Sequence, residues 1–255
     1  NNIQTKDFSW TTSLNFGHNH NKLTKIYGDQ DQIISGVRIH KVGEPYYSFY
    51  GYEYAGVDPA TGKESFYLND GTADARKTTT DPSKAHKVIG NHETSLEGGL
   101  SNNLTWKFID FGLNFTFSLG GKAYDGATWQ HDNGSYLFRG AVPAYYDINK
   151  TWKGPGDTSA SQPVFQYGNT SENSSRWLMP TDYLRLKSLT LGLTTPGNWV
   201  SRFGLSKARF YFAASNLLTW KSKDLTVDPE MRVDGVCTFQ TPALRTFTFG
   251  LELGF

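Results

Sequence analysis

The chain has 255 residues, with 25 Lys and Arg against 24 Asp and Glu, so its formal net charge at pH 7 is +1. This balance gives no electrostatic case for nucleic acid as a partner. The single cysteine, Cys237, excludes a disulfide framework and a thiolate metal cluster, and we expect it to be a small residue in a loop. No apolar run approaches the ~18 residues of a membrane helix, which excludes helical spans but leaves a barrel of alternating strands open.

The N-terminal residues lead almost directly into a strand. Residues 1–7 contain no charged region, apolar run or small-residue cleavage site of the kind that makes a secretory signal. The pattern therefore predicts a fragment, or part of a larger polypeptide.

Alternating apolar residues predict an all-β fold, because successive side chains of a strand point to opposite faces. Residues 109–119 are the clearest case, with an apolar residue at every second position. We expect seven or eight antiparallel strands and no convincing amphipathic helix. The other segments with this pattern are residues 7–17, 46–54, 92–106, 189–194, 208–215 and 245–255, and the Tyr-rich segment 46–54 does not separate clearly into two faces.

The C-terminal segment, residues 245–255, allows two interpretations. Its apolar side chains could fill the core of a soluble sandwich or face lipid in a transmembrane barrel, whose strands need about 9–11 residues. We favour the barrel because the chain stops on an aromatic residue, as a strand that closes a barrel wall at the membrane interface would. The expected lipid-facing side chains are Phe247, Phe249, Leu251, Leu253 and Phe255.

The charged residues of the predicted strands fall on the face opposite the apolar side chains. A sandwich core would also exclude charge, so this arrangement is compatible with both interpretations and is required by the barrel. The residues concerned are Glu93, Glu97, Asp110, Arg209 and Glu252.

Long and short connections alternate along the predicted strands. Residues 55–92, 122–181 and 217–244 are long, whereas residues 103–108 and 195–205 are short. Outer-membrane barrels alternate in this way between long external loops and short periplasmic turns. The first connection, residues 18–45, departs from the pattern, which implies either an extra strand near residues 33–42 or an unusually large turn.

Aromatic residues gather at or near the ends of the predicted strands. They suit the aromatic girdles of a membrane barrel, although Trp and Tyr also suit any β core. The girdle candidates are Trp10, Tyr46, Tyr47, Trp106, Tyr183, Trp199, Trp220 and Phe255.

No catalytic, cofactor or metal site is expected. Glu93, Ser95 and Glu97 would share one face of a strand, and a glycosidase-like carboxylate pair is conceivable, but lining of a polar interior is the favoured interpretation. His18 and His20 would also share a face, without a visible third metal ligand.

A set of landmarks covers most of the chain in a fixed order. The landmarks are Val42-Gly-Glu-Pro45, the run from Ser48 to Lys63, Tyr183-Leu-Arg-Leu-Lys-Ser-Leu-Thr-Leu-Gly-Leu193, Ala208-Arg-Phe-Tyr211, Ser215-Asn-Leu-Leu218, Asp228-Pro-Glu230 and Arg245-Thr-Phe-Thr-Phe-Gly-Leu251. No single landmark is decisive, but the ordered set resembles the C-terminal part of the SusC/RagA family of TonB-dependent outer-membrane transporters.

The resemblance implies that residues 1–255 form the C-terminal part of a large transmembrane β-barrel of about 22 strands, with long extracellular loops and a plugged lumen. The plug and the N-terminal strands would lie upstream. The implied function is import of oligosaccharides, glycans or peptides under a SusD-like surface lipoprotein, with energy from TonB. A dimer of transporter–lipoprotein pairs in the outer membrane of a Bacteroidetes-like bacterium is also implied.

Aromatic and polar residues of the long connection 122–181 are the candidates for substrate contact, because aromatic faces suit sugar rings and apolar peptide side chains. They could equally pack the loop on itself or touch the lipoprotein. Two alternative functions are a carbohydrate-binding sandwich module and an outer-membrane enzyme on a smaller barrel. The substrate candidates are Trp129, Tyr136, Phe138, Arg139, Tyr145, Tyr146 and Trp152.

Overall fold

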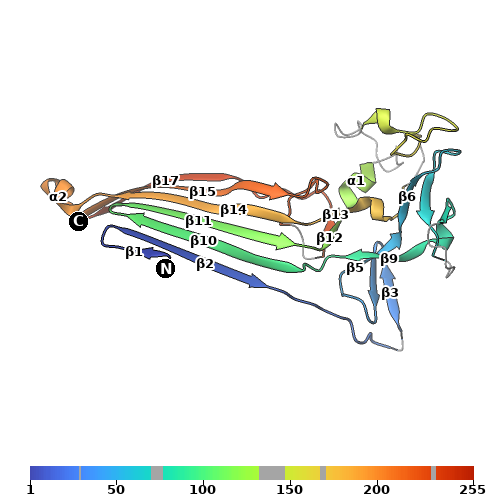
Figure 1. Ribbon diagram of the computed structural model, residues 1–255, viewed down its shortest axis with the longest axis horizontal. Helices are drawn as coiled ribbons and strands as arrows, with labels where there is room; N and C mark the ends of the chain where they lie inside the picture. Colours follow the sequence, from blue (N-terminus) through green and yellow to red (C-terminus); the bar gives the residue numbers. More distant parts are fainter. Residues whose placement is uncertain (29, 70–76, 132–146, 167–170, 231–233) are drawn as a thin grey trace.

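The computed structural model describes residues 1–28, 30–69, 77–131, 147–166, 171–230 and 234–255. Figure 1 shows an elongated molecule in which one sheet of long strands joins a body of short strands and loops at one end. We call this end the loop body. It is built from the described parts of three connections, residues 18–95, 120–182 and 222–245.

The long sheet contains seven strands in the order β1-β2-β10-β11-β14-β15-β17, all antiparallel to their neighbours. This agrees with the predicted number. The strands are β1 (Ile3–Gln4), β2 (Phe8–Gly17), β10 (Leu96–Trp106), β11 (Ile109–Leu119), β14 (Tyr183–Thr194), β15 (Lys207–Lys221) and β17 (Thr246–Gly254).

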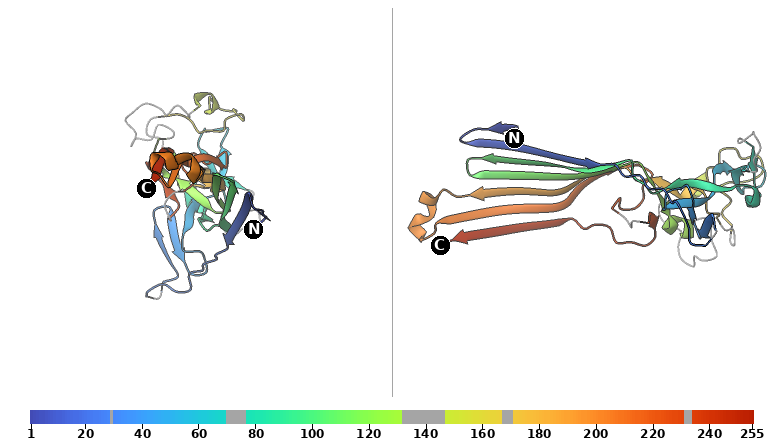
Figure 2. Two further views of the ribbon diagram at one scale, coloured as in Figure 1. Left: turned by 90° about the vertical axis from the view of Figure 1, so that its left-hand side faces the viewer. Right: turned by 90° about the horizontal axis from the view of Figure 1, so that it is seen from below.

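The register places apolar side chains in rows on one face and polar or small side chains on the other. Leu191, Phe212 and Phe249 are direct neighbours across β14, β15 and β17. The apolar face lies open, since Phe249 is 80% and Leu251 is 55% exposed. These side chains therefore do not interlock with a second sheet, as the core of a sandwich would require. Figure 2 shows the long sheet extending away from the loop body without a covering layer.

The register shifts at one point where β14 meets both of its neighbours. Lys187 has no partner in either ladder, because Ser188 and Leu186 are the paired residues on its two sides. On β15 the facing irregularity includes Asn216, whose φ of 53° is positive. A bulge of this kind moves the following side chains to the other face of the sheet.

The loop body contains three small sheets. They are β3-β4-β5-β9, β6-β7-β8 and β13-β12-β16, the last with one parallel pairing. The strands are β3 (Gln32–Ser35), β4 (Arg38–Lys41), β5 (Ser48–Tyr52), β6 (Tyr54–Val57), β7 (Glu64–Tyr67), β8 (Thr78–Thr79), β9 (His86–Asn91), β12 (Lys122–Asp125), β13 (Leu178–Pro180) and β16 (Val236–Cys237).

The prediction that residues 46–54 form a strand of the same sheet as the others was wrong. This segment contains β5, which lies inside the loop body, where Phe49 packs with Tyr124 and Trp177 in a buried cluster. Both faces of β5 are covered, so its residues do not alternate between apolar and polar. The first connection departed from the predicted alternation of long and short loops for the same reason. Since β5 is not a wall strand, residues 18–95 form one long connection from β2 to β10.

The helices are short. None of those in the described ranges combines the length and the hydropathy of a membrane-crossing helix. They are α1 (Gly126–His131), α2 (Gly197–Val200) and the 3-10 turns η1 (Pro82–Lys84), η3 (Ile148–Lys150), η4 (Ser175–Trp177) and η5 (Ser201–Phe203).

Cys237 corrects a second prediction, because it lies in β16 and not in a loop. It is fully buried in a cluster with Ala123, Met179 and Leu225. Burial, with the nearby charges of Asp125 and Asp234, raises the pKa of its thiol to about 12. The thiol is therefore a packing group at neutral pH.

Candidate functional site at the polar face of the long sheet

The polar face carries charges that are paired across strands. Arg209 of β15 reaches over β14 to Asp110 of β11, with Nη2 and Oδ2 2.6 Å apart. Gly192 of β14 lies beneath this ion pair, and a Cβ atom at its position would overlap both charged groups. Because Gly192 has no side chain, Arg209 of β15 and Asp110 of β11 can form an ion pair over β14.

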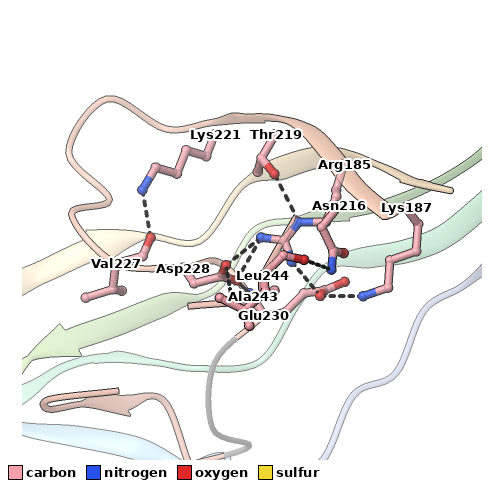
Figure 3. Close-up of polar contacts among 10 residues, drawn as sticks. All are labelled: Arg185, Lys187, Asn216, Thr219, Lys221, Val227, Asp228, Glu230, Ala243 and Leu244. Carbon is pink, nitrogen blue, oxygen red and sulfur yellow. Dashed lines mark hydrogen bonds and ion pairs between the residues drawn. The ribbon is translucent and has the colours of Figure 1, made fainter. Parts of the chain in front are cut away.

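A second, buried group of charges lies where the polar face meets the loop body. Arg185 of β14 is 2% exposed. Its Nη2 is 2.8 Å from both carboxylate oxygens of Asp228, and its Nη1 is 2.6 Å from Oε2 of Glu230. Its Nε donates to Thr219 Oγ1 at 3.0 Å. We call Arg185, Lys187, Asp228 and Glu230 the clamp (Figure 3).

The clamp holds residues 222–245, the connection between β15 and β17, against the sheet. Lys187 Nζ is 2.6 Å from Glu230 Oε2, and the amide of Ala243 donates to Asp228 Oδ2 at 3.1 Å. Lys221 Nζ donates to the carbonyl of Val227 (Figure 3). Two cations meet two carboxylates here, so the ionic groups balance. Four hydrogen bonds from its three nitrogen atoms offset the cost of removing the Arg185 guanidinium from water.

The pKa of Asp228 reflects two opposing effects. Burial raises the pKa of its carboxyl group, but the hydrogen bonds from Arg185 and from the amides of Glu230 and Ala243 lower it. The net pKa lies below the ordinary value of 3.8, so Asp228 is ionised at neutral pH. The clamp is therefore an ionic contact under ordinary conditions.

A cavity of about 550 Å³ lies beside the clamp. Its lining combines Glu97 of β10, Thr116 of β11 and Tyr183 of β14 with Glu230 of the held connection. Glu97 makes no ion pair or side-chain hydrogen bond within the described part of the chain. The cavity thus presents hydroxyl groups, an aromatic ring and carboxylate oxygens, which are groups that hold polar solutes.

Comparison with known proteins gives a consistent result. The chain is 30% identical to TonB-dependent receptor P3 of Formosa agariphila, over all of this chain and 27% of the relative. It is 26% identical to TonB-dependent receptor SusC of Bacteroides thetaiotaomicron, over 99% of this chain and 25% of the relative. It superposes on the structure of the RagAB peptide transporter with a TM-score of 0.85 and 26% identity, over 99% of this chain and 28% of that one.

The chain corresponds to the C-terminal portion of a SusC/RagA-like transporter. It spans about a quarter of the length of the curated relatives that it matches. No family model matches it. SusC and RagA are outer-membrane β-barrel proteins, so the long sheet is a section of a barrel wall and the loop body, built from its long connections, is extracellular. The seven strands do not close on themselves.

The structure places two of the predicted substrate candidates. Trp129 of α1 packs on the cluster of Phe49, Tyr124 and Trp177, and its Nε1 donates to the carbonyl of Ser171 at 2.8 Å. Trp152 covers Gly62, and its Nε1 donates to the carbonyl of Pro59 at 2.9 Å. Both indole N–H groups therefore donate to backbone carbonyls within the loop body. The candidates Tyr136, Phe138, Arg139, Tyr145 and Tyr146 lie outside the described residues.

The interpretation of Glu93, Ser95 and Glu97 as one strand face was wrong, because β10 begins at Leu96. Glu93 instead accepts a hydrogen bond from the amide of Asn21 at 2.6 Å and lies 3.2 Å from His20 Nδ1. His18 and His20 follow the end of β2, so they do not share a strand face either. No group of three metal-binding side chains occurs among the described residues.

The girdle candidates divide into three sets. Tyr46 and Tyr47 lie in the loop body and not at the end of a wall strand, so that assignment was wrong. Tyr183 begins β14 but lines the lumenal cavity. The other candidates, Trp10, Trp106, Trp199, Trp220 and Phe255, lie in or next to the wall strands or the short turns.

Local patterns in the sequence do not indicate the clamp. A continuous alternation along β14 would put Arg185 on the same face as Leu189 and Leu191. The bulge at Lys187 shifts the alternation by one residue, so Arg185 lies on the polar face. The available signal was the presence of a cation in a wall strand together with Asp228 and Glu230 in the next long connection.

Proposed function

We propose that this chain forms the C-terminal wall and external loops of a transporter that imports large nutrients across the outer membrane. One observation carries the proposal: a continuous two-faced wall, apolar outside and polar inside, that matches TonB-dependent receptors along the whole chain. The relatives are receptors and a transporter, which supports a role in transport and not in catalysis.

The apolar face is proposed to contact the acyl chains of the bilayer. Phe247, Phe249, Leu251, Leu253 and Phe255 are between 44% and 92% exposed in the chain. Removing each Phe or Leu from water contributes on the order of 1.5–3 kcal/mol. A lipid environment therefore stabilises this face, whereas water would not.

The proposed substrate class is oligosaccharides, glycans or peptides that are too large for a porin. A relative of known structure is named as a peptide transporter, which supports peptides for that protein. Here the lumenal cavity beside the clamp offers polar groups that suit either class. We place the solute path along the polar face and past this cavity.

The proposed partners are a SusD-like surface lipoprotein over the loop body and TonB, which would act through parts of the transporter outside this chain. The matched RagAB complex supports the lipoprotein. A dimer of transporter–lipoprotein pairs is proposed on the same resemblance.

The test is an uptake assay with the complete transporter and its lipoprotein in an outer membrane. Labelled oligosaccharides and peptides are supplied with and without a protonophore. We expect one class to accumulate only while the proton gradient is intact. The control is the same transporter without its TonB-contacting segment. Failure to import any probe of either class, in cells where the barrel is correctly inserted, would refute the proposal.

A further inference from the structure

Two short turns lie in contact at the end of the wall opposite the loop body. Lys107 and Phe108 make the turn between β10 and β11, and the turn from β14 to β15 contains α2 and η5. The amide of Thr194 donates to the carbonyl of Phe108, and the rings of Phe108 and Trp199 are 6.0 Å apart. The two turns therefore lie side by side, and α2 lies at the far end of the sheet from the loop body (Figure 1).

This surface carries more cations than anions. Lys107 and Arg202 are exposed, and neither side chain makes an ion pair or hydrogen bond within the described residues. Lys107 also occupies a backbone position with φ of 52°, which Asn or Gly would adopt with less strain. The turns formed by residues 5–7, 107–108 and 195–206 contain three cations and a single carboxylate, Asp7. The surface is therefore positively charged.

Large aromatic side chains surround these cations. Trp199 is 59% exposed, Phe203 is 73% exposed and Trp106 is 57% exposed. Trp and other aromatic residues prefer the depth of the lipid headgroups, where the ring meets both apolar and polar surroundings. The aromatic residues thus place Lys107 and Arg202 at the level where phospholipid phosphates lie.

We propose that Lys107 and Arg202 bind the phosphate groups of anionic phospholipids in the periplasmic leaflet, with Trp199 and Phe203 inserted beside them. The proposal rests on the orientation given above, in which the loop body is outside the cell and the short turns face the periplasm. Unpaired cations in a membrane protein are attracted to anionic headgroups, and this attraction is screened by salt. The occupant is a phospholipid because, in the orientation given above, these turns lie at the periplasmic membrane surface, where headgroup phosphates meet the level of the aromatic side chains.

The test uses the complete transporter in nanodiscs of phosphatidylethanolamine, with and without phosphatidylglycerol. Lipid retained through delipidation is counted by native mass spectrometry. The variant is Lys107→Gln with Arg202→Gln, and the control is Lys41→Gln with Lys63→Gln, which removes the same charge from exposed positions of the loop body. We expect the first variant to lose phosphatidylglycerol affinity about fivefold per cation, the factor that corresponds to ~1 kcal/mol.

Equal retention by the wild type and the first variant, or an equal loss in the control, would overturn the proposal. The uptake assay separates it from the proposed function. A transporter that imports its substrate but shows no preference for phosphatidylglycerol refutes the lipid site alone. A protein that binds phosphatidylglycerol but imports nothing refutes import and leaves the lipid site standing.

Discussion

Arg185 is the residue that ties the connection between β15 and β17 to the long sheet. It is buried in the barrel wall, and its guanidinium donates hydrogen bonds to Thr219, Glu230 and Asp228. A guanidinium is suited to this position because its planar donors engage both oxygens of Asp228 together with Glu230. Lysine would supply the charge without this geometry.

We predict that Arg185→Met loosens residues 222–230. The substitution leaves Asp228 and Glu230 partly buried without their main partner, which costs about 1–3 kcal/mol of local stability. Hydrogen exchange at the amides of Glu230 and Ala243 should accelerate. Lys187→Met is the matched control, because this lysine is 43% exposed and its pair contributes below about 1 kcal/mol. Equal exchange in the two variants would show that Arg185 does not hold the connection.

The clamp should also respond to acid. The pKa of Asp228 is lower in the folded protein than the ordinary 3.8, so its contribution to stability is complete above 3.8 and is lost as the pH falls through the folded value. We expect exchange at residues 222–230 to rise only in that acidic range. Asp228→Asn should remove the pH dependence. A rise centred near neutral pH would assign the effect to another group.

The two faces of β17 give a direct test of lipid contact. Leu251→Arg would place a charge on the apolar face in the row of Ile109, Leu193 and Phe210, between the interface, where the cost is about 0–1 kcal/mol, and the midplane, where it is roughly 2–4 kcal/mol. Glu252→Arg changes a half-exposed lumenal residue whose ion pair with Lys207 spans 3.4 Å, and the expected effect is below about 1 kcal/mol. We expect reduced amounts of the folded, membrane-inserted transporter for the first variant only. Equal yields of the two would contradict the assignment of the faces.

At the scale of strands, alternation predicted most of the wall because each wall strand has one apolar and one polar face. The segment 109–119 coincides with β11. The prediction failed at residues 46–54 because β5 is covered on both sides, where Ser48 and Phe49 are both buried. A strand that is buried on both faces has no alternation to detect.

The bulge at Lys187 shows a second limit of sequence patterns. On one side of it the lumenal residues of β14 are Tyr183 and Arg185, and on the other side they are Ser188, Thr190 and Gly192. Without the extra residue, Arg185, the third residue of β14 at its loop-body end, would fall on the apolar face, where a charge near the membrane interface costs about 0–1 kcal/mol. The single bulged residue therefore decides where the clamp can form.

At the scale of the whole molecule, the chain combines a thin wall with a packed external body. The wall is held by the pairing of its long strands, and its apolar face is exposed in this chain. The loop body has its own buried clusters, such as Tyr52, Phe66 and Ala85, and resembles a small soluble fold in this respect. Asp228 and Glu230, from the connection that follows β15, join the loop body to the wall through Arg185.

The sequence alone determined the all-β class, six of the seven wall strands, the two faces of most of these strands and the resemblance to SusC/RagA transporters. These follow from local periodicity and from an ordered set of short motifs. Only the tertiary structure decided the position of β5, the bulge in β14 and the partners of Arg185. These depend on contacts between residues far apart in the chain, such as Arg185 and Asp228, which are 43 positions apart, and no local pattern records them.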